Sequence, residues 1–289
     1  SIIILTFNSI EFIKSCIDSI FDQDYQDFEI IIVDNGSRDG TPDFIRENYP
    51  QVILIKNMQN LGACRARNQG IDKSKGEWIL TLDCDVILEK NFLSQILKAI
   101  ENLSPSLGMV QPQTLNADKE TIYSTGIFLS SLGRFYDMDK GKKNNGRLDR
   151  SQYVFGACSA AALYRRDMLE AIKEDTGYFD ERFFFLVEDV DLAWRAQRED
   201  WKALFCPEAI CYHHGNSSSS DKPLRQFLCW RNRRFLLKKQ QLNRLKSATI
   251  YLIYDLPRLI FLFLANSYVR NEVMDKDNGR IAGCNKIKR

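Results

Sequence analysis

The sequence predicts an α/β protein with a mixed, mostly parallel central sheet flanked by helices, followed by a helical C-terminal tail. In the first hundred residues, short runs rich in Ile, Leu and Val alternate with longer amphipathic runs, which is the pattern of βαβ units. The apolar runs are nearly continuous, as in strands that are covered on both faces. Beyond residue 105 the alternation weakens into shorter β-like runs, so we expect the second half of the sheet to be partly antiparallel.

In the first half, polar turn residues stand where each strand should end. The expected strands cover residues 1–7, 28–34, 52–56 and 77–83, and the expected helices cover 11–21, 42–48 and 63–71. Asn8, Asp34, Asn60 and Asp83 lie at the four strand ends. Ligands of open α/β sheets bind at the carboxyl ends of the strands, so these residues predict one shared pocket.

The second half is less regular. We expect β-like runs at 108–112, 121–138 and 152–164, a polar loop at 140–151, helices at 165–174 and 188–198, and a strand pair at 203–205 and 209–212. A Ser-rich stretch then precedes a basic segment. The expected organisation is therefore one domain over residues 1–220, with halves that meet near residue 104, and a helical region over residues 221–289.

Composition places the chain among soluble globular proteins. Of its 289 residues, 44% are hydrophobic and 27% are charged, and the formal net charge of only +2 predicts no general affinity for nucleic acid. The eight cysteines form no C-x-x-C pair and no zinc-like spacing, and no charged-then-apolar signal segment is recognisable. We therefore expect reduced thiols in a cytoplasmic protein.

Asp83 and Asp85 follow an apolar strand, one residue apart. On an ideal strand, positions i and i+2 point the same way. Two carboxylates this close repel each other, and a divalent cation such as Mg²⁺ or Mn²⁺ relieves that repulsion. The alternative is that both residues form a turn, because Asp has a strong turn preference. Their place directly after a buried strand favours the metal.

Two further groups lie near the expected strand ends. Asp34 and Asn35 come straight after a run of aliphatic residues and could hydrogen-bond a base or a ribose. Arg65 and Arg67 open the next expected helix and could reach a diphosphate by charge-assisted bonds. The alternative for the arginines is a solvated helix face. No G-x-G-x-x-G and no P-loop motif is present.

Three acids, Glu188, Asp189 and Asp191, adjoin the aromatic run at 183–185. A carboxylate beside apolar surface tends to have a raised pKa and suits a general base. The alternative is that these acids simply favour the positive end of a helix dipole.

The only two histidines, His213 and His214, are adjacent and follow an apolar run. Histidine is a frequent metal ligand, so either residue could complete a site begun by Asp85. A structural histidine pair is the alternative.

Taken in order, these segments resemble family 2 glycosyltransferases of the Rossmann-like GT-A fold, in particular the bacterial rhamnosyltransferase-like members that build cell-surface polysaccharide. The segments that carry the resemblance are "ILTFNS", "VDNGSRDGT", "NLGACRARNQG", "LDCD", "FGACSAAALYRRD", "FDERFFFLVEDVDLAWR" and "YHHGNSSS". They extend from residue 1 to about residue 220, and their order and spacing are more specific than any one of them.

The resemblance implies that a sugar is transferred with inversion from a nucleoside-diphosphate donor, dTDP-rhamnose or a UDP-sugar, to a hydroxyl of a glycan or lipid-linked glycan acceptor. It makes residues 1–104 the nucleotide-binding half and 105–220 the acceptor half. Asp189, beside Glu188, would be the catalytic base, and Asp85 would bind the metal with His213 or His214. Asn216 replaces the usual glycine near the histidines, which leaves that choice open. The residues that would contact or flank the donor are Thr6, Asn8, Asp34, Asn35, Arg67, Asp83, Trp194 and Arg195.

Two other classes of function are weighed against this one. A nucleotidyltransferase-like nucleotide-sugar enzyme would share the strand-end acids, but it usually carries a Gly- and Arg/Lys-rich loop after the first strand, and residues 6–16 contain no glycine. A non-catalytic nucleotide-sugar-binding subunit is disfavoured because Asp83, Asp85 and Asp189 are intact. The Q-x-x-R-W motif of processive relatives is absent, which favours the addition of single sugars.

The tail from Pro223 interleaves Arg and Lys with Leu, Phe and Trp. This pattern is typical of a helix lying on an anionic membrane surface, and it predicts peripheral contact through residues 223–270 at the inner face of the cell membrane. A helix packed on the preceding domain is the alternative. The apolar stretch 248–265 is interrupted by Asp255, Pro257 and Arg258, so we expect it to be interfacial or buried rather than spanning. Nothing indicates RNA binding or an oligomeric state.

Overall fold

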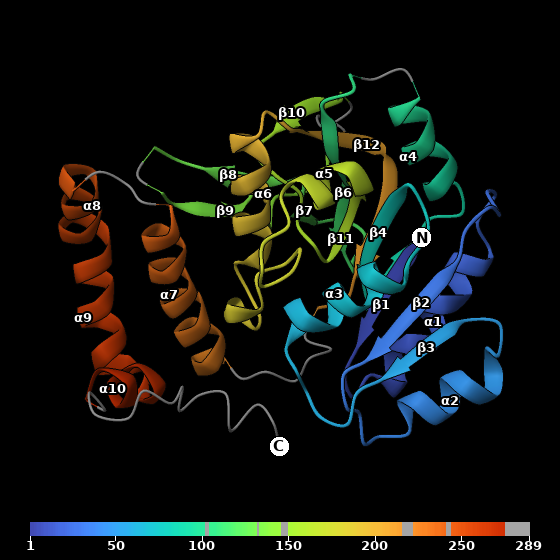
Figure 1. The fold of residues 1–289 in the computed structure, drawn as a ribbon, viewed down its shortest axis with the longest axis horizontal. Helices are drawn as coiled ribbons and strands as arrows, with labels where there is room; N and C mark the ends of the chain where they lie inside the picture. The colour runs from blue at the N-terminus through green and yellow to red at the C-terminus, as the bar shows by residue number, and fades with distance from the viewer. Residues whose placement is uncertain (102–103, 132, 146–149, 216–221, 241–243, 275–289) are drawn as a thin grey trace.

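The computed structural model describes residues 1–101, 104–131, 133–145, 150–215, 222–240 and 244–274 (Figure 1). The Ser-rich stretch at 216–221 and the chain after residue 274, which the sequence analysis assigned to a loop and to the tail, lie outside the described residues. The seven cysteines within the described part are free thiols.

The first half follows the predicted βαβ order. Its elements are β1 (Ile2–Thr6), α1 (Ile10–Phe21), β2 (Ile30–Asp34), α2 (Thr41–Asn48), β3 (Ile53–Lys56), α3 (Ala63–Lys73), β4 (Trp78–Asp83), β5 (Val86–Leu88) and α4 (Phe92–Ile100). Strands β1 to β4 pair in parallel in the order β4-β1-β2-β3. The expected strands and helices of this half are confirmed, whereas β5 and α4 were not foreseen.

The second half completes a mixed sheet. It comprises β6 (Leu107–Asn116), β7 (Ile122–Ser124), β8 (Ile127–Leu129), β9 (Phe135–Asp137), β10 (Gln152–Val154), β11 (Ala161–Arg165), α5 (Arg166–Ala171), the 3-10 turn η1 (Glu181–Phe183), α6 (Glu188–Arg198) and β12 (Lys202–His213). The whole sheet runs β10-β12-β6-β11-β4-β1-β2-β3, with β5 on β12 and β7 on β6. Strand β11 is antiparallel to both of its neighbours, as expected for a mixed, mostly parallel sheet.

Two details differ from the sequence prediction. The strand pair expected at 203–205 and 209–212 is one long strand, β12, whose register against β6 shifts between Cys206 and Ile210. Pro207 lies within that shift, and a proline cannot donate a ladder hydrogen bond, so the chain bulges there and then continues. The helix expected at 165–174 is shorter and ends at Ala171.

The core forms on both faces of the sheet, because strand residues alternate between them. Ile2 and Ile4 face one cluster, which α1, α2 and α4 cover, whereas Ile3 faces a second cluster, which α3, α5 and α6 cover. Strand β2 is buried along its whole length. This two-sided burial is the physical reason for the continuous apolar runs in the sequence.

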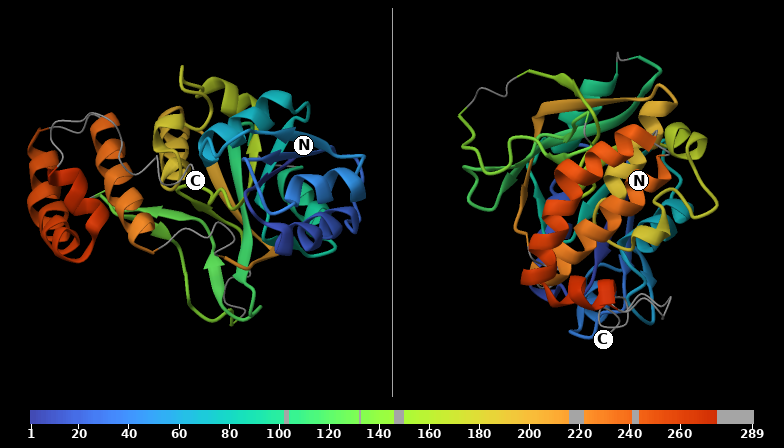
Figure 2. Two further views of the ribbon diagram at one scale, coloured as in Figure 1. Left: turned by 90° about the horizontal axis from the view of Figure 1, so that it is seen from below. Right: turned by 90° about the vertical axis from the view of Figure 1, so that its left-hand side faces the viewer.

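The tail forms a helical layer beside the sheet domain. It contains α7 (Lys222–Lys239), α8 (Arg244–Ile250), the π-helical turn η2 (Tyr251–Asp255), α9 (Leu256–Ala265) and α10 (Ser267–Met274). Figures 1 and 2 show α7 between α6 on one side and α8 and α9 on the other. A separate apolar cluster joins α7 to the later helices and includes Phe227, Trp230, Leu262 and Val269.

The apolar stretch of the tail is helical along its whole length. The described segment Ser247–Ala265 has 19 residues and a mean hydropathy of 1.6, and only 17% of it is buried. By length and composition alone, it is long and apolar enough to cross a membrane. The π-turn precedes Pro257, whose missing N–H would otherwise break the helix. Asp255 is buried and paired with Arg233. Asp255, Pro257 and Arg258 lie within this helix as the sequence shows, and its interfacial rather than spanning placement stays a prediction.

Candidate functional site

The ends of β1 and β2 place Thr6 beside Asp34 in the parallel register. Both side chains are buried. One carboxylate oxygen of Asp34 accepts hydrogen bonds from the backbone N–H groups of Gly36 at 3.2 Å and Ser37 at 3.1 Å. Burial raises the pKa of Asp34, although these hydrogen bonds act in the opposite direction. Its other oxygen and the Thr6 hydroxyl have no partner among the described residues, and buried polar atoms are rarely left so unless a ligand satisfies them.

Asn8 and Asn35, also predicted to contact the donor, connect loops in the structure. Asn8 has φ 51°, and its side-chain oxygen accepts from Arg38 N–H at 2.8 Å, which ties the loop after β1 to the loop after β2. The Asn35 amide donates to Asn60 and to the Gly62 carbonyl, and it accepts from Leu61 N–H and Asn57. These four bonds use its full capacity, so we do not propose Asn35 as a direct ligand.

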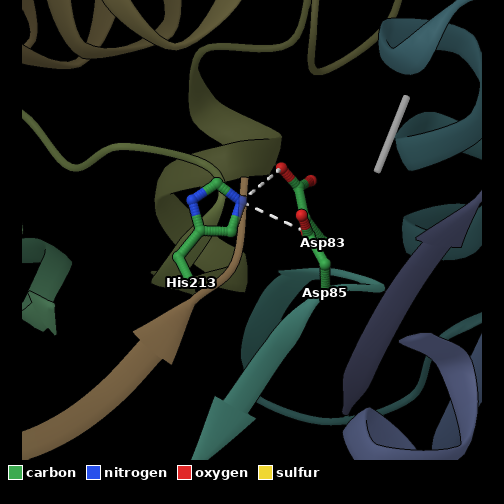
Figure 3. A group of neighbouring side chains, drawn as sticks. All are labelled: Asp83, Asp85 and His213. Carbon is green, nitrogen blue, oxygen red and sulfur yellow. Dashed lines mark ion pairs between the residues drawn. The ribbon is translucent and has the colours of Figure 1, made fainter. Parts of the chain in front are cut away.

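Asp83, Asp85 and His213 form a compact cluster at the edge of the sheet (Figure 3). The His213 Nε2 atom lies 3.2 Å from Oδ1 of Asp85 and 3.9 Å from Oδ2 of Asp83. Pairing of β5 with β12 sets His213 opposite Val86, next to the Asp85 turn. Ligand atoms of the three residues lie within 4.8 Å of one another. Carboxylate oxygens and an imidazole nitrogen are donors that divalent cations accept, so this set fits such an ion.

The charges of this cluster shift its proton affinities. Burial raises the pKa of Asp83, against the opposing effects of Arg67 and His213. Burial by itself would lower the pKa of His213, but the hydrogen bond to Asp85 and the charges of both carboxylates outweigh it, so the pKa is raised. The raised pKa favours the protonated imidazole, which relieves the same carboxylate repulsion that a metal ion would relieve.

The structure distinguishes the two histidines. The His214 backbone N–H donates to the Asp85 carbonyl at 3.0 Å, but its imidazole is exposed and lies against Phe12, with the ring centroids 5.9 Å apart. Successive side chains at a strand end point in opposite directions. His213 is therefore the histidine that joins the aspartates, and His214 is not.

Arg67 connects the strand-end acids to the acids of α6. Its Nη2 lies 3.0 Å from Oδ1 of Asp83, and its Nη1 lies 2.5 Å from Oε1 of Glu188. The Arg67 and Glu188 side chains are each 4% exposed. Thus acids that are a hundred residues apart in the sequence share one guanidinium, as the prediction of a single site requires. Arg65, in contrast, is exposed and 3.9 Å from Glu181.

The three acids at the start of α6 have separate environments. Glu188 is paired with Arg67, whereas Asp191 is fully buried and paired with Arg195. Asp189 accepts a long hydrogen bond from the Ser159 N–H at 3.5 Å. Burial, together with the negative charges of Glu188 and Asp137, raises the pKa of Asp189 to about 7. A carboxylate with this pKa exchanges protons near neutral pH, which suits a general base.

The backbone before these acids is strained. Phe184, Leu186 and Val187 have φ values of 67°, 69° and 74°. Left-handed conformations are rare for residues with a side chain, above all for β-branched valine, and each costs about 1–3 kcal/mol. Such strain persists only where the surrounding structure holds it, and it is commonly found at functional sites.

Trp194 and Arg195, which the resemblance implies contact or flank the donor, make other contacts in the structure. Trp194 packs edge-on against Phe155. The Arg195 guanidinium bonds to Asp191, to the Ile172 carbonyl and to the Tyr178 carbonyl. Because its donors are engaged in this buried structure, we do not propose Arg195 as a donor ligand.

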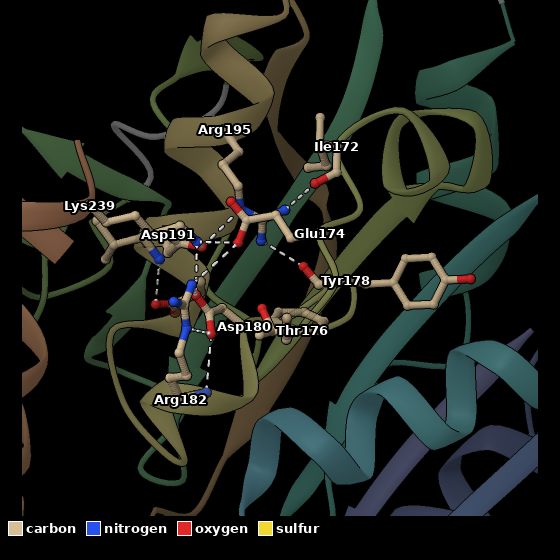
Figure 4. A network of polar contacts seen from close by, with 12 residues as sticks. Ile172, Glu174, Thr176, Tyr178, Asp180, Arg182, Asp191, Arg195 and Lys239 are labelled. Atoms are coloured by element: carbon tan, nitrogen blue, oxygen red, sulfur yellow. Dashed lines mark hydrogen bonds and ion pairs between the residues drawn. The ribbon is translucent and has the colours of Figure 1, made fainter. Parts of the chain in front are cut away.

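Arg195 belongs instead to a network of polar contacts around Asp180 and Asp191 (Figure 4). Lys239 of α7 donates to Glu174 at 2.6 Å and to both Asp180 and Asp191 at 2.9 Å. Burial opposes ionisation of Asp180, but the bonds from Arg182 and Lys239 outweigh it and lower its pKa. Three acids converge here as they would around a metal, yet the lysine ammonium already supplies the cation.

Two residues near the site were not predicted from the sequence. Tyr123 of β7 lies edge-on to His213, with the ring centroids 4.2 Å apart. Asn232 of α7 bonds to three carbonyl groups just before Glu188. Neither position carries a local sequence signal, since a tyrosine in a β-like run and an asparagine in a basic helix are unremarkable until their partners are known.

The fold and this site define the class. The chain adopts the GT-A fold of glycosyltransferases. The mannosyltransferase PcManGT from Pyrobaculum calidifontis, solved in complex with GDP-Man and Mn²⁺, superposes with a TM-score of 0.59 at 17% sequence identity, covering 99% of this chain and 77% of that chain.

The family follows from the sequence profile of glycosyl transferase family 2, which matches residues 1–173. The chain belongs to this family. A poly-beta-1,6-N-acetyl-D-glucosamine synthase of Staphylococcus epidermidis is 24% identical over 218 residues, or 73% of this chain and 49% of that protein. An N-acetylglucosaminyl-diphospho-decaprenol L-rhamnosyltransferase of Mycobacterium tuberculosis is 28% identical over 215 residues, or 67% of this chain and 69% of that protein. The chain thus spans about half the length of the synthase.

Proposed function

We propose that this glycosyltransferase moves a sugar, with inversion, from a nucleoside-diphosphate donor to a hydroxyl group of a glycan or lipid-linked glycan in cell-surface polysaccharide synthesis. The observation that carries the proposal is the bridge formed by Arg67, because it joins Asp83 on the side of the candidate metal cluster to Glu188 beside the candidate base. A donor and an acceptor need these two functions on opposite sides of one reacting carbon.

On the donor side, Thr6 and Asp34 would accept hydrogen bonds from the nucleoside through their unsatisfied oxygens. Asp83, Asp85 and His213 would hold Mg²⁺ or Mn²⁺. Such an ion, when bound, neutralises the charge that develops on a departing diphosphate. Support comes from the mannosyltransferase above, which was solved with GDP-Man and Mn²⁺. The donor would be the UDP-sugar or dTDP-rhamnose that the resemblance implies, and the names of a polysaccharide synthase and an L-rhamnosyltransferase among the relatives are compatible with it.

On the acceptor side, Asp189 would take the proton of the attacking hydroxyl. Its pKa of about 7 means that roughly half of the molecules carry the basic form at neutral pH. General-base assistance of this kind contributes about 10²–10⁴-fold in rate. Glu188 is less suited to that role, because its carboxylate forms a buried ion pair with Arg67.

The experiment for this proposal is a panel of UDP-, dTDP- and GDP-sugars with Mg²⁺ or Mn²⁺, scored by transfer or hydrolysis. With the best donor, Asp189→Asn should abolish transfer and leave the calorimetric donor affinity within about threefold, because the amide is isosteric and only the base is lost. If donor affinity falls as far as activity, the assignment of Asp189 as the base fails.

We further propose that the tail contacts an anionic membrane surface on the cytoplasmic side, where lipid-linked acceptors would be met. Apolar side chains are exposed along one length of the tail helix at Tyr251, Leu252, Ile253, Ile260, Phe261 and Leu264. Exposed basic residues flank them at Arg234, Lys238 and Arg258. Apolar area next to basic charge is what a helix needs to bind anionic lipid.

A further inference from the structure

Helix α7 of the tail holds the strained backbone that precedes the acids of α6. The Asn232 side-chain amide donates to the carbonyl groups of Phe183 at 3.0 Å, Phe185 at 2.8 Å and Leu186 at 2.7 Å. Asn232 is 1% exposed. One buried amide thus shares its two N–H groups among three carbonyls of the segment that contains the positive-φ residues.

Neighbouring residues of α7 strengthen the attachment. Arg231 donates to the Phe183 carbonyl at 2.8 Å and also to the Asn232 side-chain oxygen at 2.9 Å, which fixes the amide with its N–H groups toward the loop. Phe185 and Leu186 pack against the apolar cluster that contains Leu224 and Phe227. The loop is therefore held from the tail by polar and apolar contacts together.

We propose that Asn232 is a positioning residue for transfer: it holds the 183–187 segment, which contains three residues with positive φ, and so sets the place of Asp189. The inference rests on the proposed role of Asp189. Without these hydrogen bonds, less of the surrounding structure holds the strained residues at positive φ values, and we expect the first turn of α6 to shift relative to Arg67 and the strand ends. Asn232 acts through the loop and does not itself contact the reacting atoms.

The test compares Asn232→Asp with Asn232→Ala. Aspartate keeps the shape of asparagine but points a carboxylate oxygen at the three carbonyls. Alanine removes the donors without adding repulsion. One variant therefore remains informative if the other fails to fold. The matched control is Asn266→Asp. Asn266 is equally buried in the tail, and its side chain bonds to the Pro223 carbonyl, to Gln226 and to the backbone of Tyr268 and Val269 rather than to the described 183–191 segment.

Two measurements separate positioning from general stability. Hydrogen–deuterium exchange, which needs no substrate, should become faster in residues 183–191 of both Asn232 variants and stay unchanged there in Asn266→Asp. With the best donor of the nucleotide-sugar panel, kcat should fall by about 10²-fold while donor KM changes little, since a displacement of about 1 Å costs that much. The rising limb of the pH profile should move toward lower pH as Asp189 becomes more exposed.

Unchanged exchange in residues 183–191, or an equal loss of kcat in Asn266→Asp, would overturn the inference. Measuring Asp189→Asn in the same series distinguishes a failure of the proposed base from a failure of the inference about Asn232. If Asp189→Asn is inactive while both Asn232 variants match the unaltered protein, only the inference about Asn232 fails. If Asp189→Asn remains active, the proposed base is wrong, and the positioning role falls with it even where exchange becomes faster.

Discussion

The guanidinium of Arg67 lies 2.5 Å from the carboxylate of Glu188, although 121 positions separate the two residues in the chain. The same guanidinium bonds to Asp83. Helix α3, which follows the third strand, thus presents one cation to acids from β4 and from α6. Both halves of the sheet domain meet at this ion pair, so it affects stability as well as the site.

Arg67→Ala should destabilise the protein by roughly 3–5 kcal/mol, because it leaves the Glu188 carboxylate buried without a cation. Denaturant unfolding measures the change. Arg46→Ala is the matched control: Arg46 forms an exposed pair with Asp43 one turn away, and exposed pairs contribute about 0–1 kcal/mol. Equal midpoints for Arg67→Ala and Arg46→Ala would contradict the structural role of the bridge.

The pH dependence of transfer should follow Asp189. A base must be deprotonated, and its pKa is raised to about 7, so kcat/KM should rise with pH up to about 7 and level off above it. Below that point the rate should fall about tenfold per pH unit. Initial rates at low donor concentration give the profile, and donor affinity measured over the same range is the control. A midpoint near the ordinary aspartate value of about 4 would speak against this base.

Binding of Mn²⁺ should depend on His213 and not on His214. Replacing Asp85 or His213 by Ala should weaken Mn²⁺ affinity by about tenfold or more, because each substitution removes a ligand atom from a set of three. His214→Ala should leave it unchanged, since that ring faces Phe12. Calorimetric titration with MnCl₂ and the donor nucleotide gives the affinities.

A second acidic cluster supplies the control for the metal assignment. Glu174→Gln alters the group around Asp180 and Asp191, where Lys239 already provides the positive charge. We expect its Mn²⁺ affinity to equal that of the unaltered chain. If Glu174→Gln loses Mn²⁺ binding and Asp85→Ala retains it, the ion binds at the Glu174 cluster and the proposed metal site is wrong.

The tail should bind anionic vesicles through its exposed apolar side chains. Leu252→Glu or Phe261→Glu should weaken partition by about tenfold or more, because burying such a side chain contributes about 1.5–3 kcal/mol. Flotation with vesicles of anionic and of neutral lipid measures the partition. Met58→Glu, at a 91% exposed position in the sheet domain, is the control. Equal partition of all three variants would remove the support for a membrane contact.

The candidate site could be predicted from the sequence where chemistry is local. Asp34 and Asp83 end buried strands, and a strand end at the carboxyl edge of a parallel sheet points at the ligand whatever the rest of the chain does. Arg195 shows the limit of the approach. It follows the E-D pair by a few residues, but the helix turns its side chain away from Asp189 and toward the Asp191 network.

The sequence alone predicts most strands and helices of the first half, because continuous apolar runs and amphipathic periods depend only on which faces must be buried. It also determined the family and the acids at the strand ends. The folded structure was needed to choose between His213 and His214, to connect Arg67 to Glu188, and to place Asn232 against the loop before Asp189. Those contacts join segments that are distant along the chain, and no local pattern encodes which of many polar residues will meet when the sheet and the tail pack together.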